Sequence, residues 1–245
     1  MKVLDSISEK PRWILLENVK GFVGSDMLDL WYKCLGENGY SWEEYLLTPT
    51  QFGIPNHRKR YYIICERSNR FRKNSSKLSG QLLDSTSASE DVPTGSLERK
   101  EPCSIAKYLQ DQSELNLDLY VINDCILQKK WANQIGVVSS RDNLSHCFTA
   151  AYGRQIHKAT GSILLMDPER KKSLSEVPLD RSDMMRYSGL LRRFTPRELL
   201  RIFGFPEFFC FPENISLEHQ YKLIGNSVNV TVVAHLVECL IGGFL

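Results

Sequence analysis

The most informative stretch of this 245-residue sequence is Trp13-Ile14-Leu15-Leu16-Glu17-Asn18-Val19. It begins with four consecutive apolar residues, and such a run is typical of a strand that is buried on both faces of a parallel sheet. A carboxylate, Glu17, follows the run directly. In α/β domains the carboxyl ends of the strands face the ligand crevice. The stretch therefore predicts a buried strand that ends at a functional site.

The residues that follow predict a helix and two further strands. Ser25 can cap a helix, and Gly36 and Gly39 end it. The apolar positions of this helix fall on one face: Leu28, Trp31 and Leu35. Residues 45–47 and 60–65 then form apolar runs that are typical of strands. Strand, helix and strand in alternation predict an α/β fold.

The composition of the chain changes twice, and these changes predict three segments. Residues 1–66 carry the predicted strands and form the first segment. Residues 67–214 begin as a linker rich in Ser, Lys, Arg and Asp, and continue after residue 101 as a small lobe of mixed short segments. Residues 215–245 are helical and form the third segment.

Two helix starts are encoded near the C-terminus. Thr195-Pro196-Arg197-Glu198 is a capping box with proline at the first helical position. Ser216 can cap another helix that ends near Gly225, and residues 228–240 are apolar on most sides, as expected of a buried closing helix. Four arginines accompany the first of these helices and suit either a structural role or contact with phosphates: Arg192, Arg193, Arg197 and Arg201.

Composition argues against several classes of protein. A net charge of +2 and a pI near 8.1 do not by themselves indicate nucleic-acid binding, so any such surface has to be local. The seven cysteines include no C-x-x-C pair, and we expect no metal site. Their odd number and the lack of a signal-like segment predict reduced thiols and a location in the cytoplasm or nucleus. The apolar runs are too short to predict a membrane span.

Three short motifs lie in a fixed order along the chain. They are Glu17-Asn18-Val19, the stretch at 53–60 that contains Asn56, Arg58 and Arg60, and Gly225-Asn226-Ser227-Val228. Each alone has a simpler interpretation: a carboxylate follows many strands, an Arg-x-Arg pair is usually a solvated strand edge, and a Gly-Asn-Ser turn is usually a helix boundary. Because all three motifs occur together, a shared functional site is a better interpretation than three unrelated structural features.

Together the motifs resemble the C-terminal motifs of the cytosine-C5 methyltransferases. That family has Glu-Asn-Val, Gln-x-Arg-x-Arg, a target-recognition region, Arg-x-Phe-Thr-x-Arg-Glu and Gly-Asn-Ser-Val. The fourth element reads Arg193-Phe194-Thr195-Pro196-Arg197-Glu198 here, and the resemblance covers nearly the whole chain, least in the recognition region. It implies an α/β fold: a partial Rossmann-like, S-adenosylmethionine-dependent methyltransferase domain, with the later strands and the closing helix, and a small mixed target-recognition lobe. The resemblance also implies that residues 1–66 are the C-terminal part of the catalytic domain, that residues 67–214 are the linker and the recognition lobe, and that residues 215–245 return to the catalytic domain.

Two further features resemble the eukaryotic tRNA-aspartate cytosine-C5 methyltransferases, formerly classed as type-2 DNA methyltransferases. One is Cys147-Phe148-Thr149 followed by Tyr152-Gly153, and the other is the stretch at 224–234. The recognition region is also short, as in that group. The resemblance implies C5 methylation of an anticodon-loop cytosine in tRNA, with S-adenosyl-L-methionine as cofactor. A DNA cytosine-C5 methyltransferase remains the alternative, because it uses the same chemistry.

The chemistry of the family gives the matching residues their roles. A thiolate adds to cytosine C6 and makes C5 reactive toward a sulfonium methyl group, which requires that charge on the ring be neutralised. The resemblance implies that Glu17 does this at the N3 edge of the base. Arg60 matches the arginine beside the ring, where it can hold O2 and support the carboxylate. Arg58 matches the motif's other arginine and is the third candidate catalytic residue.

The remaining motif residues are candidates for binding. Asn226, Ser227 and Val228 match the motif that closes over the methionine end of the cofactor. The candidates for binding the substrate are Asn18, Asn56, Cys147, Phe148 and Thr149. Asn56 departs from the family's glutamine, which is a mild change between neutral amides. For Cys147 a packing role is an equal alternative, and we interpret the capping box as structural.

The family's nucleophile lies in a Pro-Cys-Gln loop that precedes the Glu-Asn-Val motif. Sixteen residues precede Glu17 in this chain and none is cysteine, while Pro102-Cys103 comes after Glu17 and follows no apolar strand. The family's Phe-x-Gly-x-Gly cofactor loop is also missing from the sequence. We therefore expect a chain that starts within the catalytic domain, is marginally stable because one strand edge is exposed, and transfers no methyl group alone.

Two alternatives of another kind stay open. A non-catalytic isoform that binds RNA or a partner protein would be consistent with the missing loop. A generic nucleotide-binding α/β protein would require a glycine-rich loop, which the sequence does not contain.

Overall fold

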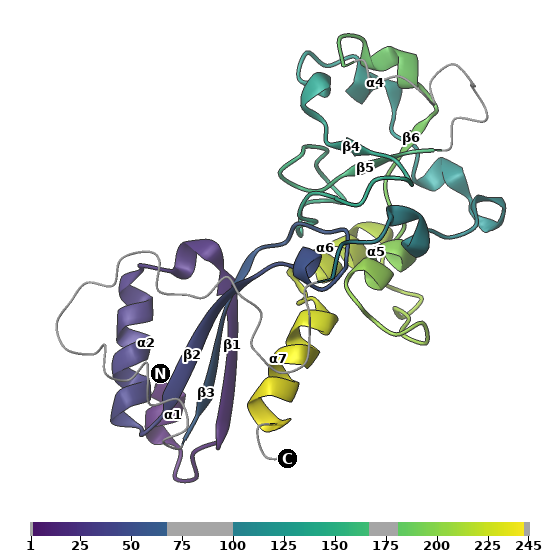
Figure 1. Cartoon of the computed structure of the whole chain (residues 1–245). Coiled ribbons are helices and arrows are strands. Elements are labelled where there is room, and N and C mark those ends of the chain that lie inside the picture. The colour runs from purple at the N-terminus through teal and green to yellow at the C-terminus, as the bar shows by residue number, and fades with distance from the viewer. Residues whose placement is uncertain (1, 68–99, 167–180, 243–245) are drawn as a thin grey trace. The chain divides into compact units, whose positions relative to one another are not determined.

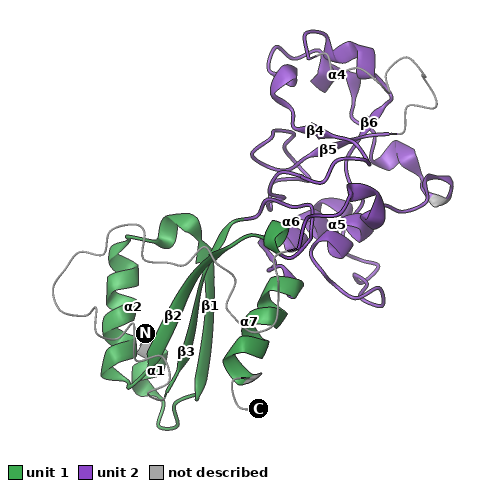
Figure 2. Cartoon of the chain, viewed as in Figure 1, with its two compact units in different colours: residues 1–51, 59–99, 231–245 green, residues 52–58, 100–230 purple. Residues whose placement is uncertain are grey.

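The computed structural model of this chain describes residues 2–67, 100–166 and 181–242 and divides the chain into two compact units (Figures 1 and 2). Unit 1 comprises residues 1–51, 59–99 and 231–245, and unit 2 comprises residues 52–58 and 100–230. The sequence assigns residues 52–58 and 215–230 to the catalytic segments, yet in the structure they belong to unit 2. Most of the predicted linker, from residue 68 to residue 99, lies outside the described residues.

Unit 1 is built on a three-stranded sheet of β1 (Trp13–Val19), β2 (Ser41–Leu47) and β3 (Arg60–Glu66). The strand order is β1-β3-β2, and β3 runs antiparallel to both neighbours. The prediction that the first strand pairs in a parallel sheet is therefore wrong for the described residues. β1 and β2 do run parallel to each other, with α2 (Asp26–Glu37) between them in the chain, but residues 48–59 then return the chain so that β3 lies between them.

Helices lie on both sides of this sheet (Figure 2). α2 packs on one face, where its buried residues Leu28 and Leu35 share a cluster with Tyr61 and Ile63 of β3. The alternate residues of β3 point to the opposite face, on the side of α7 (Val230–Gly242). A short helix, α1 (Lys2–Ser6), precedes the first strand. The α/β layering that the sequence predicts is therefore present in unit 1.

The signals predicted for α2 act as expected. The Ser25 hydroxyl accepts a hydrogen bond from Leu28 N–H, with 3.3 Å between the two heavy atoms. The helix runs through Gly36 to Glu37, and Gly39 follows with φ of +74°, a left-handed conformation that glycine adopts without strain. Leu28 and Leu35 are buried as predicted, whereas Trp31 is only half-buried.

β1 forms one edge of the sheet. Among the described residues it pairs with β3 alone. Its side chains from Trp13 to Asn18 are half-buried, so the strand is not buried on both faces as the apolar run predicts. A strand at the edge of a sheet presents backbone N–H and C=O groups that no neighbouring strand uses. The apolar edge that the sequence predicts is thus present in the described structure.

Unit 2 combines very short strands with helices. β4 (Val137–Val138) pairs parallel with β5 (Ile163–Leu165), which pairs antiparallel with β6 (Leu191–Arg192). Its helices are α4 (Asp124–Leu127), α5 (Pro196–Ile202) and α6 (Leu217–Asn226). Single 3-10 turns occupy residues 105–108, 112–114, 117–119, 132–134 and 184–187. The mixed short segments predicted for this region are therefore observed.

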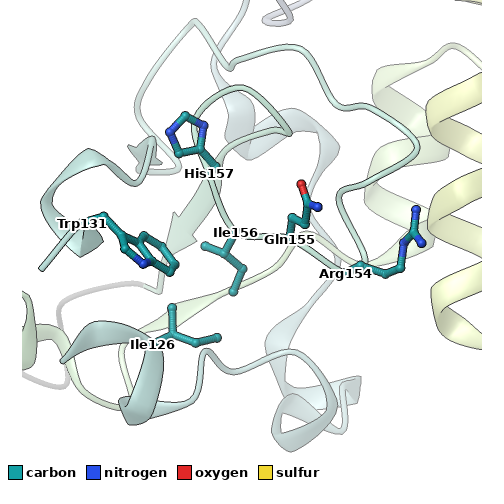
Figure 3. Close-up of a pocket in the computed structure, with 6 residues that line it drawn as sticks. All are labelled: Ile126, Trp131, Arg154, Gln155, Ile156 and His157. Atoms are coloured by element: carbon teal, nitrogen blue, oxygen red, sulfur yellow. The ribbon is translucent and has the colours of Figure 1, made fainter. Parts of the chain in front are cut away.

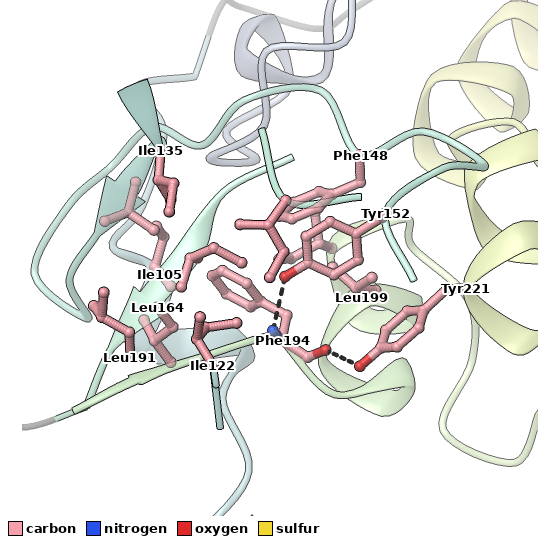
Figure 4. Close-up of a cluster of buried hydrophobic side chains, with 14 of the residues drawn as sticks. Ile105, Ile122, Ile135, Phe148, Tyr152, Leu164, Leu191, Phe194, Leu199 and Tyr221 are labelled. Atoms are coloured by element: carbon pink, nitrogen blue, oxygen red, sulfur yellow. Dashed lines mark hydrogen bonds between the residues drawn. The ribbon is translucent and has the colours of Figure 1, made fainter. Parts of the chain in front are cut away.

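Aromatic rings form the centre of the unit 2 core (Figure 4). Phe148 lies edge-to-face with Tyr152 and Phe194, at centroid distances of 5.1 and 5.3 Å. The Tyr152 hydroxyl accepts a 2.9 Å hydrogen bond from Phe194 N–H, and the Tyr221 hydroxyl donates a 2.7 Å hydrogen bond to Phe194 O. The two tyrosines satisfy both backbone groups of Phe194 inside the core, so they tie α6 to the segment that leads into α5.

The capping box starts α5 as predicted. The Thr195 hydroxyl accepts from Glu198 N–H, and the Glu198 carboxylate accepts from Thr195 N–H. The same carboxylate accepts two 2.7 Å hydrogen bonds from Arg192, and both side chains are fully buried. Arg201 pairs with Glu207 at 2.7 Å on the surface. Three of the four arginines near this helix therefore serve the fold: Arg192, Arg197 and Arg201.

One segment of the chain has the length and composition of a membrane span. It is Leu217–Ile241, although the core helix of a globular protein passes the same test. In the structure this segment comprises α6 and α7, which residues 227–229 separate. Tyr221, Ile224, Val232 and Leu236 of this segment are buried.

Candidate functional site

Glu17 and Arg60 form an ion pair on one face of the unit 1 sheet. Glu17 lies opposite Tyr62 near the end of β1, and Arg60 begins β3 opposite Val19, so the strand register places both side chains on the same face. Arg60 Nε lies 3.3 Å from Glu17 Oε1. Arg60 also donates a 2.9 Å hydrogen bond to the Lys59 carbonyl oxygen, which restrains the guanidinium. The structure therefore brings together two of the three predicted catalytic residues.

This ion pair is accessible to a ligand. The exposed fractions are 24% for the Glu17 side chain and 16% for the Arg60 side chain. Among the described residues, Arg60 is the partner of Glu17 through Oε1, and no contact occupies Oε2. A carboxylate that is held on one side and open on the other can form a hydrogen bond with the polar edge of a bound molecule.

Asn18 points away from this pair. Successive strand residues lie on opposite faces of a sheet, so Asn18 shares a face with Tyr61 and not with Glu17. Its side-chain oxygen accepts a 2.8 Å hydrogen bond from Val19 N–H. The structure thus gives Asn18 a local role at the strand end, and its role in substrate binding stays a prediction.

Arg58 lies two residues before Arg60 but belongs to unit 2, where it is buried. Its guanidinium donates three hydrogen bonds to carbonyl oxygens, those of Phe148 (3.0 Å), Gly225 (3.2 Å) and Ser227 (2.6 Å). Its Cζ atom lies 5.1 Å from the ring centroid of Phe203, within the range of a cation–π contact. Arg58 therefore joins the segment at 147–149 to the motif at 225–228.

This network gives Arg58 a role that its motif did not reveal. A guanidinium presents several N–H donors in a rigid fork, so one side chain can bind several backbone carbonyls at once. Two of these carbonyls, of Gly225 and Ser227, lie at the C-terminal end of α6, where no further helical turn supplies a donor. We interpret Arg58 as a positioning residue, and its catalytic role stays a prediction.

The segment Cys147-Phe148-Thr149 alternates between surface and core. Phe148 is buried, whereas Cys147 and Thr149 are half-buried. Asn56, also fully buried, donates hydrogen bonds from Nδ2 to the two residues before the segment, at Ser145 Oγ (3.1 Å) and His146 O (2.9 Å). Burial gives Asn56 and Phe148 a role in positioning the segment, while Cys147 and Thr149 reach the surface, and these contacts do not test substrate binding by any of the four residues. Their binding of substrate stays a prediction.

The turn at 225–228 ends α6 and contains the predicted cofactor residues. Asn226 is exposed, and its side chain makes no hydrogen bond within the described part of the chain. The Ser227 hydroxyl donates a 2.7 Å hydrogen bond to Ile224 O and closes the helix. Val228 is half-buried. Of the three, Asn226 presents the polar group that is most available to a ligand.

Gly225 allows two backbone segments to approach closely. A Cβ atom there would lie 2.2 Å from Thr149 C and from Ala150 N. We expect Gly225→Ala to lower the free energy of unfolding by about 1–3 kcal/mol, the usual cost of overpacking, and to loosen the Arg58 network. Urea-induced unfolding measures this. Gly21→Ala is the matched control, because nothing lies within 4 Å of a Cβ at Gly21, and equal stability of the two variants would contradict the packing.

The cysteines show no second reactive centre. All seven lie within the described ranges and are free thiols. The Cys103 thiol donates to Gly53 O at 3.3 Å and lies 3.5 Å from the Tyr108 hydroxyl, so the Pro102-Cys103 pair is part of the unit 2 fold. Over residues 2–67, 100–166 and 181–242, no group of three His, Cys, Asp or Glu side chains is arranged to hold a metal ion.

Sequence reasoning missed several residues that hold these segments in place. The Ser145 hydroxyl donates a 2.6 Å hydrogen bond to Pro55 O and receives one from Asn56. Tyr221 satisfies the Phe194 carbonyl in the core. No local pattern marks these residues, because their partners lie far away in the sequence. The one signal in the sequence for a role of Ser145 is that it lies two residues before the segment Cys147-Phe148-Thr149.

Comparison with known proteins places these motifs in context. Residues 2–242 match the family described as C-5 cytosine-specific DNA methylase. A bovine relative named tRNA (cytosine(38)-C(5))-methyltransferase is 30% identical over 291 residues, which cover 98% of this chain and 73% of the relative. A Dictyostelium discoideum relative named DNA (cytosine-5)-methyltransferase is also 30% identical, with coverage of 98% and 68%. The crystal structure of the S. pombe Dnmt2 methyltransferase, 28% identical, aligns with a TM-score of 0.74 over 99% of this chain and 71% of that chain.

Proposed function

Because the chain belongs to the C-5 cytosine-specific DNA methylase family, we propose that it acts in the C5 methylation of cytosine in tRNA, with S-adenosyl-L-methionine as the methyl donor. The family and the fold class predicted from the sequence are confirmed by the family match over residues 2–242 and by the TM-score of 0.74. The choice of tRNA is supported by the name of the bovine relative and by the segment Cys147-Phe148-Thr149.

The Glu17–Arg60 ion pair is the observation that carries the proposal. Addition at C6 of cytosine builds charge on the ring, and a group at the N3 edge can neutralise it. Glu17 Oε2 takes no part in the ion pair and can form this hydrogen bond, while Arg60 holds Oε1. Both side chains are partly exposed, so a base that has left its stack can reach them.

We assign binding of the methyl donor to the turn at 225–228, within unit 2. Bound S-adenosyl-L-methionine supplies a sulfonium methyl group. The exposed Asn226 amide fits the amino-acid end of this molecule, because it both donates and accepts hydrogen bonds. The Ser227 hydroxyl proton is already bonded to Ile224 O, so this group is left to act as an acceptor. Val228 adds apolar contact at the same turn.

Two other functions make different experimental predictions. A DNA cytosine-C5 methyltransferase would use Glu17 and Arg60 in the same way, and the Dictyostelium relative carries such a name. A non-catalytic RNA-binding protein would retain affinity for tRNA without transferring a methyl group. Substrate preference separates the first alternative from the proposal, and cofactor binding separates the second.

Binding and labelled methyl transfer should be measured with a tRNA and with duplex DNA of matched sequence. We expect tighter binding to tRNA. Because the sequence lacks the family's Pro-Cys-Gln and Phe-x-Gly-x-Gly loops, we expect the label at C5 of an anticodon-loop cytosine only when the chain is extended with a segment that carries both loops. A preference for duplex DNA would replace the proposal with DNA methylation. Calorimetric titration with S-adenosyl-L-methionine completes the test, because tRNA binding without cofactor binding would indicate a non-catalytic RNA-binding protein.

A further inference from the structure

Unit 2 contains a pocket that none of the motifs explains (Figure 3). Its volume is about 550 Å³, within the usual range of small-ligand sites. It is lined by Ile126, Trp131, Arg154, Gln155, Ile156 and His157. The Trp131 indole faces Ile156 across the hollow, and Ile126 lies below them in the view of Figure 3. The pocket therefore has apolar walls next to polar groups.

Trp131 gives this pocket a flat aromatic wall that solvent can reach. Its exposed fraction is 41%, although it is one of the largest apolar residues in the unit. Unstacked nucleobases bind to such aromatic faces. Lys129 and Lys130 precede Trp131 directly, and both are exposed. On the opposite side, the His157 ring accepts a 3.1 Å hydrogen bond from Ala159 N–H, which leaves the second ring nitrogen for another partner.

The exposed residues His57, His146, Lys158 and Arg181 form a cationic cluster, and Lys158 directly follows His157 of the pocket lining. Partial burial lowers the pKa of His146, and the nearby positive charges of Lys158, Arg181 and His57 lower it further. A Cβ atom at Gly136 would lie 2.4 Å from His146 Cδ2 and 3.4 Å from Lys158 Cβ, so both side chains flank one backbone position. Within the described part of the chain, no carboxylate forms an ion pair with these four residues. Like charges gathered in this way attract anions such as phosphate.

The chain connects the pocket, the cationic cluster and the predicted recognition segment. His157 lines the pocket, and Lys158 of the cluster follows it directly. His146 of the cluster directly precedes Cys147, and its carbonyl oxygen is held by Asn56 at 2.9 Å. Basic and aromatic groups therefore follow one another from the recognition segment to the pocket, all within unit 2.

We propose that the pocket beside Trp131 binds an unpaired base of the RNA substrate, while the cationic cluster binds phosphates of the same strand. The inference rests on the proposed function, which supplies RNA as the substrate. A single strand offers both free base faces and a charged backbone, whereas the bases of duplex DNA are stacked inside the helix. A partner protein would use the apolar walls but would gain little from the cationic cluster.

Arg154 extends the charged surface at the rim of the pocket. Its Nε lies 3.6 Å from Glu218 Oε1, and the two side chains are 59% and 63% exposed. An exposed ion pair of this kind contributes little to stability, so a phosphate can replace the carboxylate as the partner of Arg154. Glu218→Gln should therefore leave tRNA affinity unchanged or increase it.

Trp131→Ala in the full chain tests the pocket. We expect roughly 10-fold weaker binding to tRNA in fluorescence anisotropy, the order of loss when one stacked base loses its aromatic partner. Trp131→Phe should keep most of the affinity because it keeps an aromatic face, and it should abolish most of the quenching of tryptophan fluorescence by tRNA. Phe208→Ala is the matched control, since Phe208 is an aromatic residue of unit 2 that is 86% exposed and lies outside the pocket.

Lys158→Ala tests the cationic cluster. It should weaken binding to all RNA sequences alike and lower the slope of log affinity against log salt by about one.

Unchanged affinity of Trp131→Ala, or an equal loss in Phe208→Ala, would overturn the pocket assignment while tRNA methylation stands. Binding that depends on Trp131, together with no methylation of tRNA cytosine by the chain extended with the two missing loops, would support the pocket and overturn the proposed function instead.

Discussion

In the chain extended with a segment that carries the Pro-Cys-Gln and Phe-x-Gly-x-Gly loops, replacing Glu17 with glutamine should lower methyl transfer to tRNA by about 10²–10³-fold, the loss that follows removal of one group that stabilises transition-state charge. Glutamine keeps the size of the side chain but cannot be protonated or form an ion pair with Arg60, which lies 3.3 Å away. The affinity for tRNA should change much less, because Glu17 acts on charge that develops during the reaction. Single-turnover transfer of labelled methyl at saturating tRNA measures the rate directly.

Glu37→Gln is the matched control for this prediction. Glu37 belongs to the same unit, its side chain is 62% exposed, and it pairs with Lys33 at 3.9 Å on the surface of α2. Arg60→Lys should give an intermediate loss, since lysine keeps the charge but not the fork of N–H donors. If Glu17→Gln and Glu37→Gln transferred methyl groups at the same rate, the assignment of Glu17 to the reacting base would be wrong.

Replacing Glu198 with glutamine should lower the free energy of unfolding of unit 2 by about 3–5 kcal/mol, because it leaves the Arg192 charge buried without its partner. Arg192 is fully buried, and its Nη1 and Nη2 atoms each lie 2.7 Å from a Glu198 oxygen. The Glu198 carboxylate also accepts hydrogen bonds from the backbone of Gln110 and Thr195. Typical domains are stable by about 5–15 kcal/mol, so this loss is a large share of the total. Urea-induced unfolding followed by circular dichroism measures it.

Glu207→Gln is the control for the buried pair, because Glu207 forms an ion pair with Arg201 at the other end of the same helical region. This pair has the same 2.7 Å separation, but the Glu207 side chain is 64% exposed. We therefore expect the unfolding midpoint of the Glu207→Gln variant to stay close to that of the unchanged chain. The double variant Arg192→Met/Glu198→Leu should lose less stability than the sum of the two single variants. Additive losses would show that the two side chains do not depend on each other.

The two arginines of the 53–60 stretch show how far a motif can predict structure. Residues two apart on a strand share a face, so Arg58 and Arg60 read as one strand edge in the sequence. In the structure β3 begins at Arg60, and Arg58 lies before it and enters the interior of unit 2. The partners of Arg58 are carbonyls at positions 148, 225 and 227, and no feature of the stretch itself identifies them.

The candidate substrate-binding residues are partly buried and partly exposed, and their distant packing partners again decide which. Phe148 and Asn56 match motif positions, yet both are buried, because the core of unit 2 closes around the first and the backbone of residues 145–146 binds the second. Cys147 and Thr149 keep the partial exposure that contact with a substrate requires. A motif fixes which residue types recur together, whereas the exposure of each one depends on what packs above it.

Local signals in the sequence were sufficient to define the family, the starts of α2, α5 and α6, and the carboxylate near the end of the first strand. A cap such as Ser25 or Thr195 acts on residues three positions away, and an apolar run forms a strand through its own side chains. The central place of β3, the burial of Arg58 and the pocket at Trp131 emerged from the folded chain alone. Each depends on contacts across long stretches of sequence, such as the 90 positions between Arg58 and Phe148, and no local pattern encodes which distant segments will pack together.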